Sequence, residues 1–165
     1  SRPRPSAMTV AATIWDSTYS RMMHQYHGRR DVTEVLHPSV EFGGGGLVTS
    51  NADLARFIDA LAKGTLFRDP ATLDAMLTRH SASYGLGIAV VRFDAKPSGV
   101  GGLDSLTMIG HSGFFGVNMF HIQELDVTWV SSIGQVKGFE RENRALPWWP
   151  LLKECIRIYG AEPHE

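Results

Sequence analysis

Four short apolar segments between residues 84 and 133 constrain the fold of this chain more than any other feature. They cover residues 84–93, 106–110, 117–122 and 127–133, and they are rich in β-branched and aromatic residues. A polar turn at residues 123–126 separates the last two. Glycines in the first segment indicate a close approach by another backbone. This run of segments predicts an antiparallel sheet.

Helices are predicted on both sides of the strand run. Ser50 is a good N-cap, and Asp53 three residues later completes a capping box for a helix that stops at Gly64. A second short helix starts near Asp69 and Pro70 and ends near residue 79. Residues 146–159 form a third helix with one apolar stripe, residues 11–23 show a weaker helical pattern, and residues 24–30 are expected to be loop. The fold class is therefore α+β, an antiparallel sheet flanked by helices.

Length and composition indicate one soluble domain over residues 1–165. The 43% hydrophobic and 20% charged content is ordinary for a globular chain, and the net charge of −1 gives no electrostatic reason to expect nucleic acid or an anionic membrane as partner. Residues 1–7 are rich in Pro and Arg and are expected to be disordered. No stretch is long and apolar enough to span a bilayer, and a lone Cys155 excludes an internal disulfide. The sequence does not indicate the cellular compartment of the protein.

Three glycine-containing motifs follow one another along the chain. The first is Gly-Gly-Gly-Leu-Val-Thr-Ser-Asn-Ala-Asp-Leu-Ala-Arg-Phe at 44–57, the second is Tyr-Gly-Leu-Gly at 84–87, and the third is Gly-His-Ser-Gly at 110–113 with Gly116 after it. In order and spacing they resemble class C β-lactamases, DD-peptidases and related esterases, a family of serine hydrolases that includes the penicillin-binding proteins. The resemblance covers residues 42–133, with a plausible match for the last helix.

The resemblance implies that the chain is the C-terminal part of a β-lactamase-like (transpeptidase-like) domain. A complete domain of this kind acylates its serine with an ester, a β-lactam or a D-amino-acid peptide and then deacylates with water. The family's nucleophile belongs to a Ser-x-x-Lys motif, and no serine here has lysine three residues later. We therefore expect the chain to be inactive alone, with the nucleophile on a missing N-terminal segment.

The same resemblance implies roles for four residues at the third motif. His111 and Ser112 would contact a substrate carboxylate or carbonyl, Gly113 would let the substrate backbone lie close, and the Phe114 backbone N–H would form half of an oxyanion hole. On a strand, His111 and Gly113 share one face and Ser112 takes the other. For that reason, we do not predict Ser112 as a nucleophile with His111 as its base. The simpler alternative is a strand that ends in a polar turn.

Other clusters do not predict a metal or cofactor. A possible metal-binding group near the N-terminus consists of His24, His27 and His37 with Asp31 and Glu34. The His-x-x-His spacing places two metal ligands on one face only if the segment is helical, and Gly28 argues against a helix. The four glycines at 43–46 lack the Gly-Lys-Ser/Thr of a phosphate loop and are expected to form a structural turn.

A second function from a different class is also consistent with the sequence. The chain could be a non-catalytic relic or an interaction module, because a sheet without its partner strands exposes an edge and apolar surface. Its partners would then be a missing N-terminal fragment or a second copy of itself, whereas the hydrolase would take a small acyl substrate.

Overall fold

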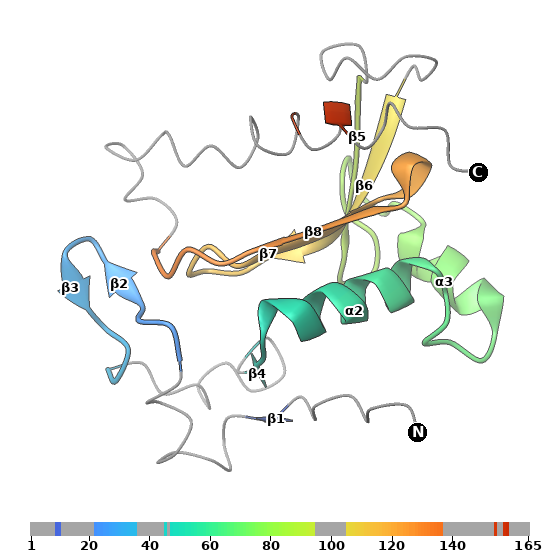
Figure 1. Ribbon diagram of the computed structural model, residues 1–165. Helices are drawn as coiled ribbons and strands as arrows, with labels where there is room; N and C mark the ends of the chain where they lie inside the picture. The colour runs from blue at the N-terminus through green and yellow to red at the C-terminus, as the bar shows by residue number, and fades with distance from the viewer. Residues whose placement is uncertain are drawn as a thin grey trace.

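A computed structural model describes residues 9–10, 22–35, 45, 47–94, 105–136, 154 and 157–158 of the chain. Its main body is a four-stranded antiparallel sheet with two helices against one face (Figure 1). This arrangement confirms the α+β class and the antiparallel sheet. No helix within the described ranges is long and apolar enough to cross a membrane.

The four strands lie in the sheet in their chain order. They are β5 (Ala89–Asp94), β6 (Ser105–Ser112), β7 (Asn118–Ile122) and β8 (Val127–Ser131). A short 3-10 turn, η5 (Gln123–Leu125), joins β7 to β8, and Asp126 closes it with a left-handed φ of 50°. The last three predicted strands are thus confirmed, and β6 runs two residues further than predicted, through His111 and Ser112.

The first predicted strand is too long at its start. Residues 84–88 form a compact bend that precedes β5: the Gly85 N–H donates to the Ile88 carbonyl at 2.8 Å, and Tyr84 forms an isolated bridge with Ala89. Gly87 has a φ of 71°, which ends extended geometry there. The predicted close backbone approach is present at Gly85, where a Cβ atom would lie 2.2 Å from the Met76 carbonyl oxygen.

Helices α2 (Asn51–Ala62) and α3 (Pro70–Leu77) form as the capping residues predict. The Ser50 side chain accepts the Asp53 N–H, and the Asp69 side chain accepts the Ala71 N–H. Gly64 follows α2 with a φ of 71°, as a helix-ending glycine should. Figure 1 shows α2 lying along β7 and β8, and the two elements are in contact with it.

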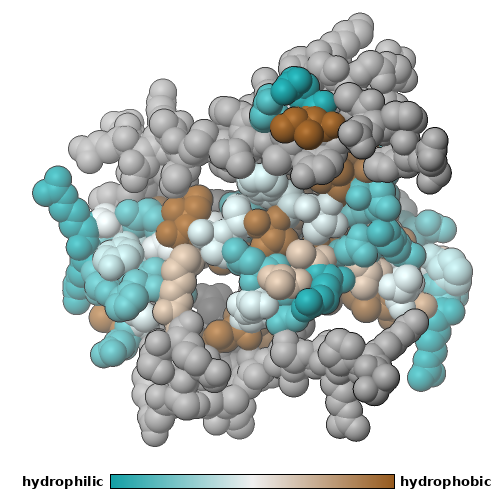
Figure 2. Space-filling model, viewed as in Figure 1, coloured by the Kyte–Doolittle hydropathy of each residue, from teal (hydrophilic) through white to brown (hydrophobic). Residues whose placement is uncertain are grey.

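Each sheet face carries its own apolar cluster. On the helix side, α2 and α3 cover a cluster of buried residues from α2, the bend and the sheet: Ile58, Leu61, Ile88, Val90 and Ile109. The opposite face carries a second cluster: Leu106, Met108, Phe120, Ile122 and Leu125. Because successive side chains on a strand point to opposite faces of the sheet, neighbouring residues belong to different clusters. In Figure 2, the hydrophobic residues of the visible face form separate spots among more polar residues, and hydrophilic residues lie at both ends.

Two small antiparallel pairs complete the described structure. β1 (Thr9–Val10) pairs with β4 (Leu47–Val48), and β2 (Tyr26–His27) pairs with β3 (Arg30–Asp31). The second pair corrects the loop expected at residues 24–30. Gly28 has a φ of 63° in the two-residue turn of this hairpin, a conformation that glycine adopts without steric cost.

Several expectations concern residues outside the described part of the chain. These are the disorder of residues 1–7, most of the helix at 11–23 and most of the glycine turn at 43–46. Of the helix expected at 146–159, only Glu154, Arg157 and Ile158 are described. All three are helical, and the Arg157 guanidinium forms an ion pair with the Glu154 carboxylate at 2.5 Å.

Candidate functional site

The third motif lies where β6 ends and turns into β7. In the sheet register His111 is opposite Met119, and Ser112 is opposite Asn118. Met119 packs in the helix-side cluster, so His111 lies on the helix side and Ser112 on the other face. The two adjacent side chains therefore point apart, as expected for neighbours on a strand.

Tyr84 forms the main side-chain contact of His111. The Tyr84 hydroxyl is hydrogen-bonded to His111 Nε2, and the rings meet edge to face with centroids 5.6 Å apart. His111 Nδ1 lies 2.8 Å from the Ser112 carbonyl oxygen, which can only accept. The proton is thus assigned to Nδ1, and Nε2 accepts from the phenol. This fixes the ring's tautomer and orientation at the protein surface.

The Ser112 hydroxyl belongs to a polar network on the opposite face. It donates to Asn118 Oδ1 at 2.8 Å, while Asn118 Nδ2 donates to the Gly116 carbonyl and to Ser131 Oγ, each at 3.2 Å. This network links β6, β7 and β8 beneath the turn. Ser112 therefore supports the turn, and its proton is already donated.

The turn after the motif is closed by two backbone hydrogen bonds. The Gly113 N–H donates to the Val117 carbonyl at 2.7 Å, and the Gly116 N–H donates to the Gly113 carbonyl at 3.2 Å. Within the described part of the chain, the Phe114 N–H has no hydrogen-bond acceptor, and its side chain is 61% exposed. An N–H without an acceptor, next to a glycine, is a donor that a bound carbonyl oxygen can use.

The other two motifs reach the same end of the sheet. Tyr84 comes from the second motif. From the first motif, Asn51 accepts a hydrogen bond at 2.6 Å from the Ser132 hydroxyl, just after β8. The next residue, Ile133, packs against Gly116, where a Cβ atom would be only 3.1 Å away. Contacts at this end of the sheet thus join the third motif to the second directly and to the first through residues 132 and 133.

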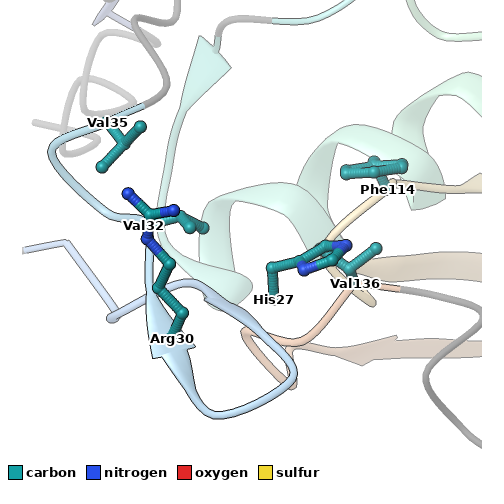
Figure 3. A pocket seen from close by; sticks show the side chains of 6 residues that line it. All are labelled: His27, Arg30, Val32, Val35, Phe114 and Val136. Carbon is teal, nitrogen blue, oxygen red and sulfur yellow. The ribbon is translucent and has the colours of Figure 1, made fainter.

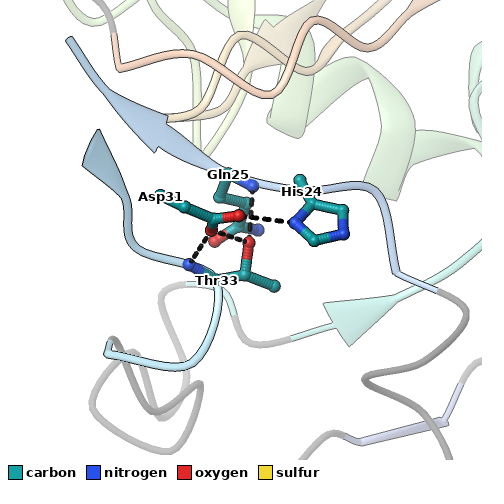
Figure 4. A network of polar contacts seen from close by, with 4 residues as sticks. All are labelled: His24, Gln25, Asp31 and Thr33. Atoms are coloured by element: carbon teal, nitrogen blue, oxygen red, sulfur yellow. Dashed lines mark hydrogen bonds and ion pairs between the residues drawn. The ribbon is translucent and has the colours of Figure 1, made fainter. Parts of the chain in front are cut away.

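His24 is hydrogen-bonded to Asp31 of the β2–β3 hairpin. The Asp31 carboxylate accepts hydrogen bonds from the Thr33 hydroxyl at 2.6 Å, from the Thr33 N–H at 2.9 Å and from His24 Nδ1 at 2.6 Å (Figure 4). These bonds, led by the Thr33 hydroxyl, lower the Asp31 pKa to about 2. His37 lies outside the described residues.

A second charged cluster lies between α2 and the sheet. Asp59, His121 and Asp126 come close enough to suggest metal ligands, but the Lys63 ammonium already pairs with both carboxylates, with Nζ 2.8 Å from Asp59 and 3.0 Å from Asp126. His121 is 4% exposed, and its burial lowers its pKa. The Asp59 carboxylate, followed by that of Asp126, raises the pKa of Lys63. This cluster is an ion-pair network that joins the helix layer to the sheet.

Comparison of the chain with protein-family models, curated proteins and solved structures found no match. The likeness to the β-lactamase family, and the roles that it implies for His111, Ser112, Gly113 and Phe114, therefore remain predictions.

Sequence reasoning did not identify every residue of this site. Tyr84 was noted only as part of a motif, and Asn118 was not singled out at all. The register of β6 against β7 brings Asn118 opposite Ser112. The hydropathy pattern does not specify which residues of the two strands lie opposite each other, so the sequence did not indicate this pairing.

Proposed function

We propose that this chain is the C-terminal portion of a β-lactamase-like serine hydrolase, and that it supplies the substrate-contacting rim of the active site. The observation that carries the proposal is the convergence of the three motifs at the β6–β7 end of the sheet. The hydrogen bond between Tyr84 and His111 joins residues 27 positions apart. The contact from Asn51 to Ser132 joins residues 81 positions apart.

In the proposed reaction, a serine hydroxyl on another segment attacks the acyl carbonyl of an ester, β-lactam or peptide-like amide. The serine forms a C–O bond to the acyl carbon, and the carbon's C–O bond to an alcohol or C–N bond to an amine breaks as that group takes up the serine's proton. In a β-lactam the amine stays tethered in the opened ring, and in every case water then releases the acid and restores the serine. The Phe114 N–H would donate to the oxyanion, with the second donor coming from the serine's own backbone. His111, held by Tyr84, would contact the substrate on the helix side of the strand, and Gly113 would leave room for the substrate backbone. The resemblance also gives Ser112 a substrate contact, but its hydroxyl is bonded to Asn118 on the other face, so it would support the turn.

The first test uses the isolated chain. We expect no turnover of a chromogenic ester or cephalosporin, and no labelling by a fluorescent penicillin, because the nucleophile is absent. Benzylpenicillin should nevertheless bind reversibly and shift the amide resonance of Phe114 and the ring resonances of His111, with no change in protein mass. A covalent adduct on any serine of this chain, or the lack of shifts at both residues, would overturn the proposal.

A pair of histidine variants sharpens this test. His111→Ala removes the imidazole ring and should weaken benzylpenicillin binding about tenfold, the scale expected when the packing of one ring against a ligand is lost. His80→Ala is the matched control, since His80 is exposed and makes no side-chain hydrogen bond within the described ranges. Equal weakening by both variants would remove His111 from the site.

The second candidate function, an interaction module, has one structural observation in its favour. Within the described residues, β5 pairs only with β6 and β8 only with β7, so each has one unpaired edge. Open edges favour strand addition from another chain. We expect the isolated chain to run as a dimer or larger species on sizing at micromolar concentration. A stable monomer would count against self-association.

A further inference from the structure

A pocket separate from the His111–Tyr84 pair lies between the β2–β3 hairpin and the sheet. It has a volume of about 320 Å³ and is lined by His27, Arg30, Val32, Val35, Phe114 and Val136. Figure 3 shows Arg30, Val32 and Val35 on one side of the pocket and Phe114 and Val136 on the other, with His27 beside Val136. Its volume is near the lower end of the ~300–1,000 Å³ found for small-molecule sites, which suits a small ligand.

Backbone hydrogen bonds hold the walls of this pocket together. The Tyr26 N–H donates to the Gly134 carbonyl at 2.7 Å, and the Val136 N–H donates to the Tyr26 carbonyl at 3.0 Å. Gln135 links the remaining parts: its N–H donates to the Phe115 carbonyl at 3.1 Å, and its side-chain amide donates to the Gly28 carbonyl at 3.1 Å. The hairpin is thus fastened to the segment after β8 and to the β6–β7 turn, so the pocket is built by tertiary structure.

The lining combines an apolar interior with positive charge. Val32 and Val136 are 7% and 5% exposed, whereas Phe114 and Val35 are 61% and 59% exposed and leave hydrophobic surface open to a ligand. Arg30 contributes a guanidinium that has no carboxylate partner within the described part of the chain. None of the described residues that line the pocket is acidic. An anionic group would therefore meet attraction without repulsion.

We propose that this pocket binds a small monocarboxylate with an apolar chain or ring. The carboxylate pairs with the Arg30 guanidinium, whose planar donors match two carboxylate oxygens. The apolar part lies against Val32, Val136 and the exposed Phe114 ring. The apolar lining disfavours inorganic phosphate, which has no apolar part to bury. The proposal does not depend on the hydrolase. The pocket shares Phe114 with the proposed oxyanion hole, so Arg30 and Val136, which belong to the pocket alone, distinguish its ligand from a ligand at His111.

The probe is 4-phenylbutyrate, with 4-phenylbutanol as its uncharged counterpart. We expect the acid to shift the amide resonances of Arg30, Phe114 and Val136 with a dissociation constant in the micromolar to millimolar range, and the alcohol to bind about tenfold more weakly because it lacks the charge-assisted bond. Equal binding of acid and alcohol, shifts confined to other residues, or no binding of the acid up to about 10 mM would each overturn the proposal.

Adjacent arginines provide a matched pair of variants. Arg30→Gln should weaken 4-phenylbutyrate binding about tenfold and leave 4-phenylbutanol unaffected. Arg29→Gln removes the same charge from the neighbouring position, which does not line the pocket, and should change neither. If both variants weakened binding of the acid equally, the effect would come from net charge and not from the pocket, and the proposal would be overturned. Amide spectra of each variant confirm that the fold is kept.

Discussion

At the scale of single residues, the glycines around the third motif have different physical roles. Gly110 has a φ of 153°, and a Cβ atom there would lie 2.0 Å from the Met119 carbonyl oxygen and 2.7 Å from the Phe120 ring. At Gly113 the nearest atom would be Val117 Cβ at 3.5 Å, an ordinary contact. The glycine required by the fold is thus Gly110, while Gly113 is the one with space beside it.

We predict that Gly110→Ala destabilises the protein by about 3 kcal/mol or more, because strained backbone and overpacking add together. Gly113→Ala should cost less than about 1 kcal/mol. Urea denaturation of both variants measures the difference. Similar losses for the two would show that the close approach at Gly110 can relax.

Asp31 provides a residue-scale prediction about pH. Its carboxyl pKa is lowered from 3.8 to about 2, so the unfolded chain binds this proton more readily. The stabilisation is present above the unfolded pKa and is lost as the pH falls through the folded pKa. Thr33→Val should move the Asp31 midpoint back toward 3.8 in a carboxyl ¹³C titration, because it removes the hydroxyl donor. Thr33→Ser keeps that donor and should leave the midpoint low.

At the scale of elements, local capping signals account for both helices of the main body. Ser50 accepts the Asp53 N–H at 3.1 Å and donates its own proton to the Asp53 carboxylate at 2.8 Å. The N-cap and N3 side chains of the predicted capping box are thus bonded to each other at the start of the helix. The cap still defines where α2 begins.

Ser50→Ala should therefore destabilise the protein by about 1 kcal/mol, the usual cost of losing an N-cap. Thr49→Ala is the control, because the Thr49 hydroxyl makes only a long 3.5 Å contact with the Ser50 carbonyl. Thermal unfolding followed by circular dichroism compares the two. A Thr49 effect as large as that of Ser50 would argue against the cap as the cause.

At the scale of the whole molecule, the helix layer is held to the sheet by apolar packing and by one charged cluster. His121 on β7 is buried below α2, with its Nδ1 3.0 Å from Thr128 Oγ1 and its Nε2 3.7 Å from Asp126. Desolvation opposes its charged form and lowers its pKa. Global stability is therefore linked to the protonation of one ring between the two layers.

The direction of this linkage can be predicted. A histidine whose pKa is lowered by folding binds its proton more readily in the unfolded chain, so stability is greatest above the unfolded value of 6.5 and falls as the pH drops toward the folded pKa. Urea midpoints measured across this range should decline for the natural chain and decline less for His121→Gln. An equal decline in both would assign the effect to other groups.

The sequence by itself determined the elements whose signals are local. The α2 and α3 caps, the glycine after α2 and the strands β6 to β8 depend on neighbours a few residues apart, and those parts of the prediction are confirmed. The β2–β3 hairpin was missed because its strands have two residues each, too few for alternation to be visible, although Gly28 at its turn was a usable signal.

Tertiary structure alone decided the site and the pocket. The Tyr84 contact with His111, the position of Asn118 beneath Ser112 and the docking of the hairpin on Gly134 all depend on strand register and on closing long loops. A shift of one residue in register would send each side chain to the other face, and no local pattern prevents that shift. Packing of two apolar clusters on opposite faces of the sheet selects the register, and that selection requires the folded chain.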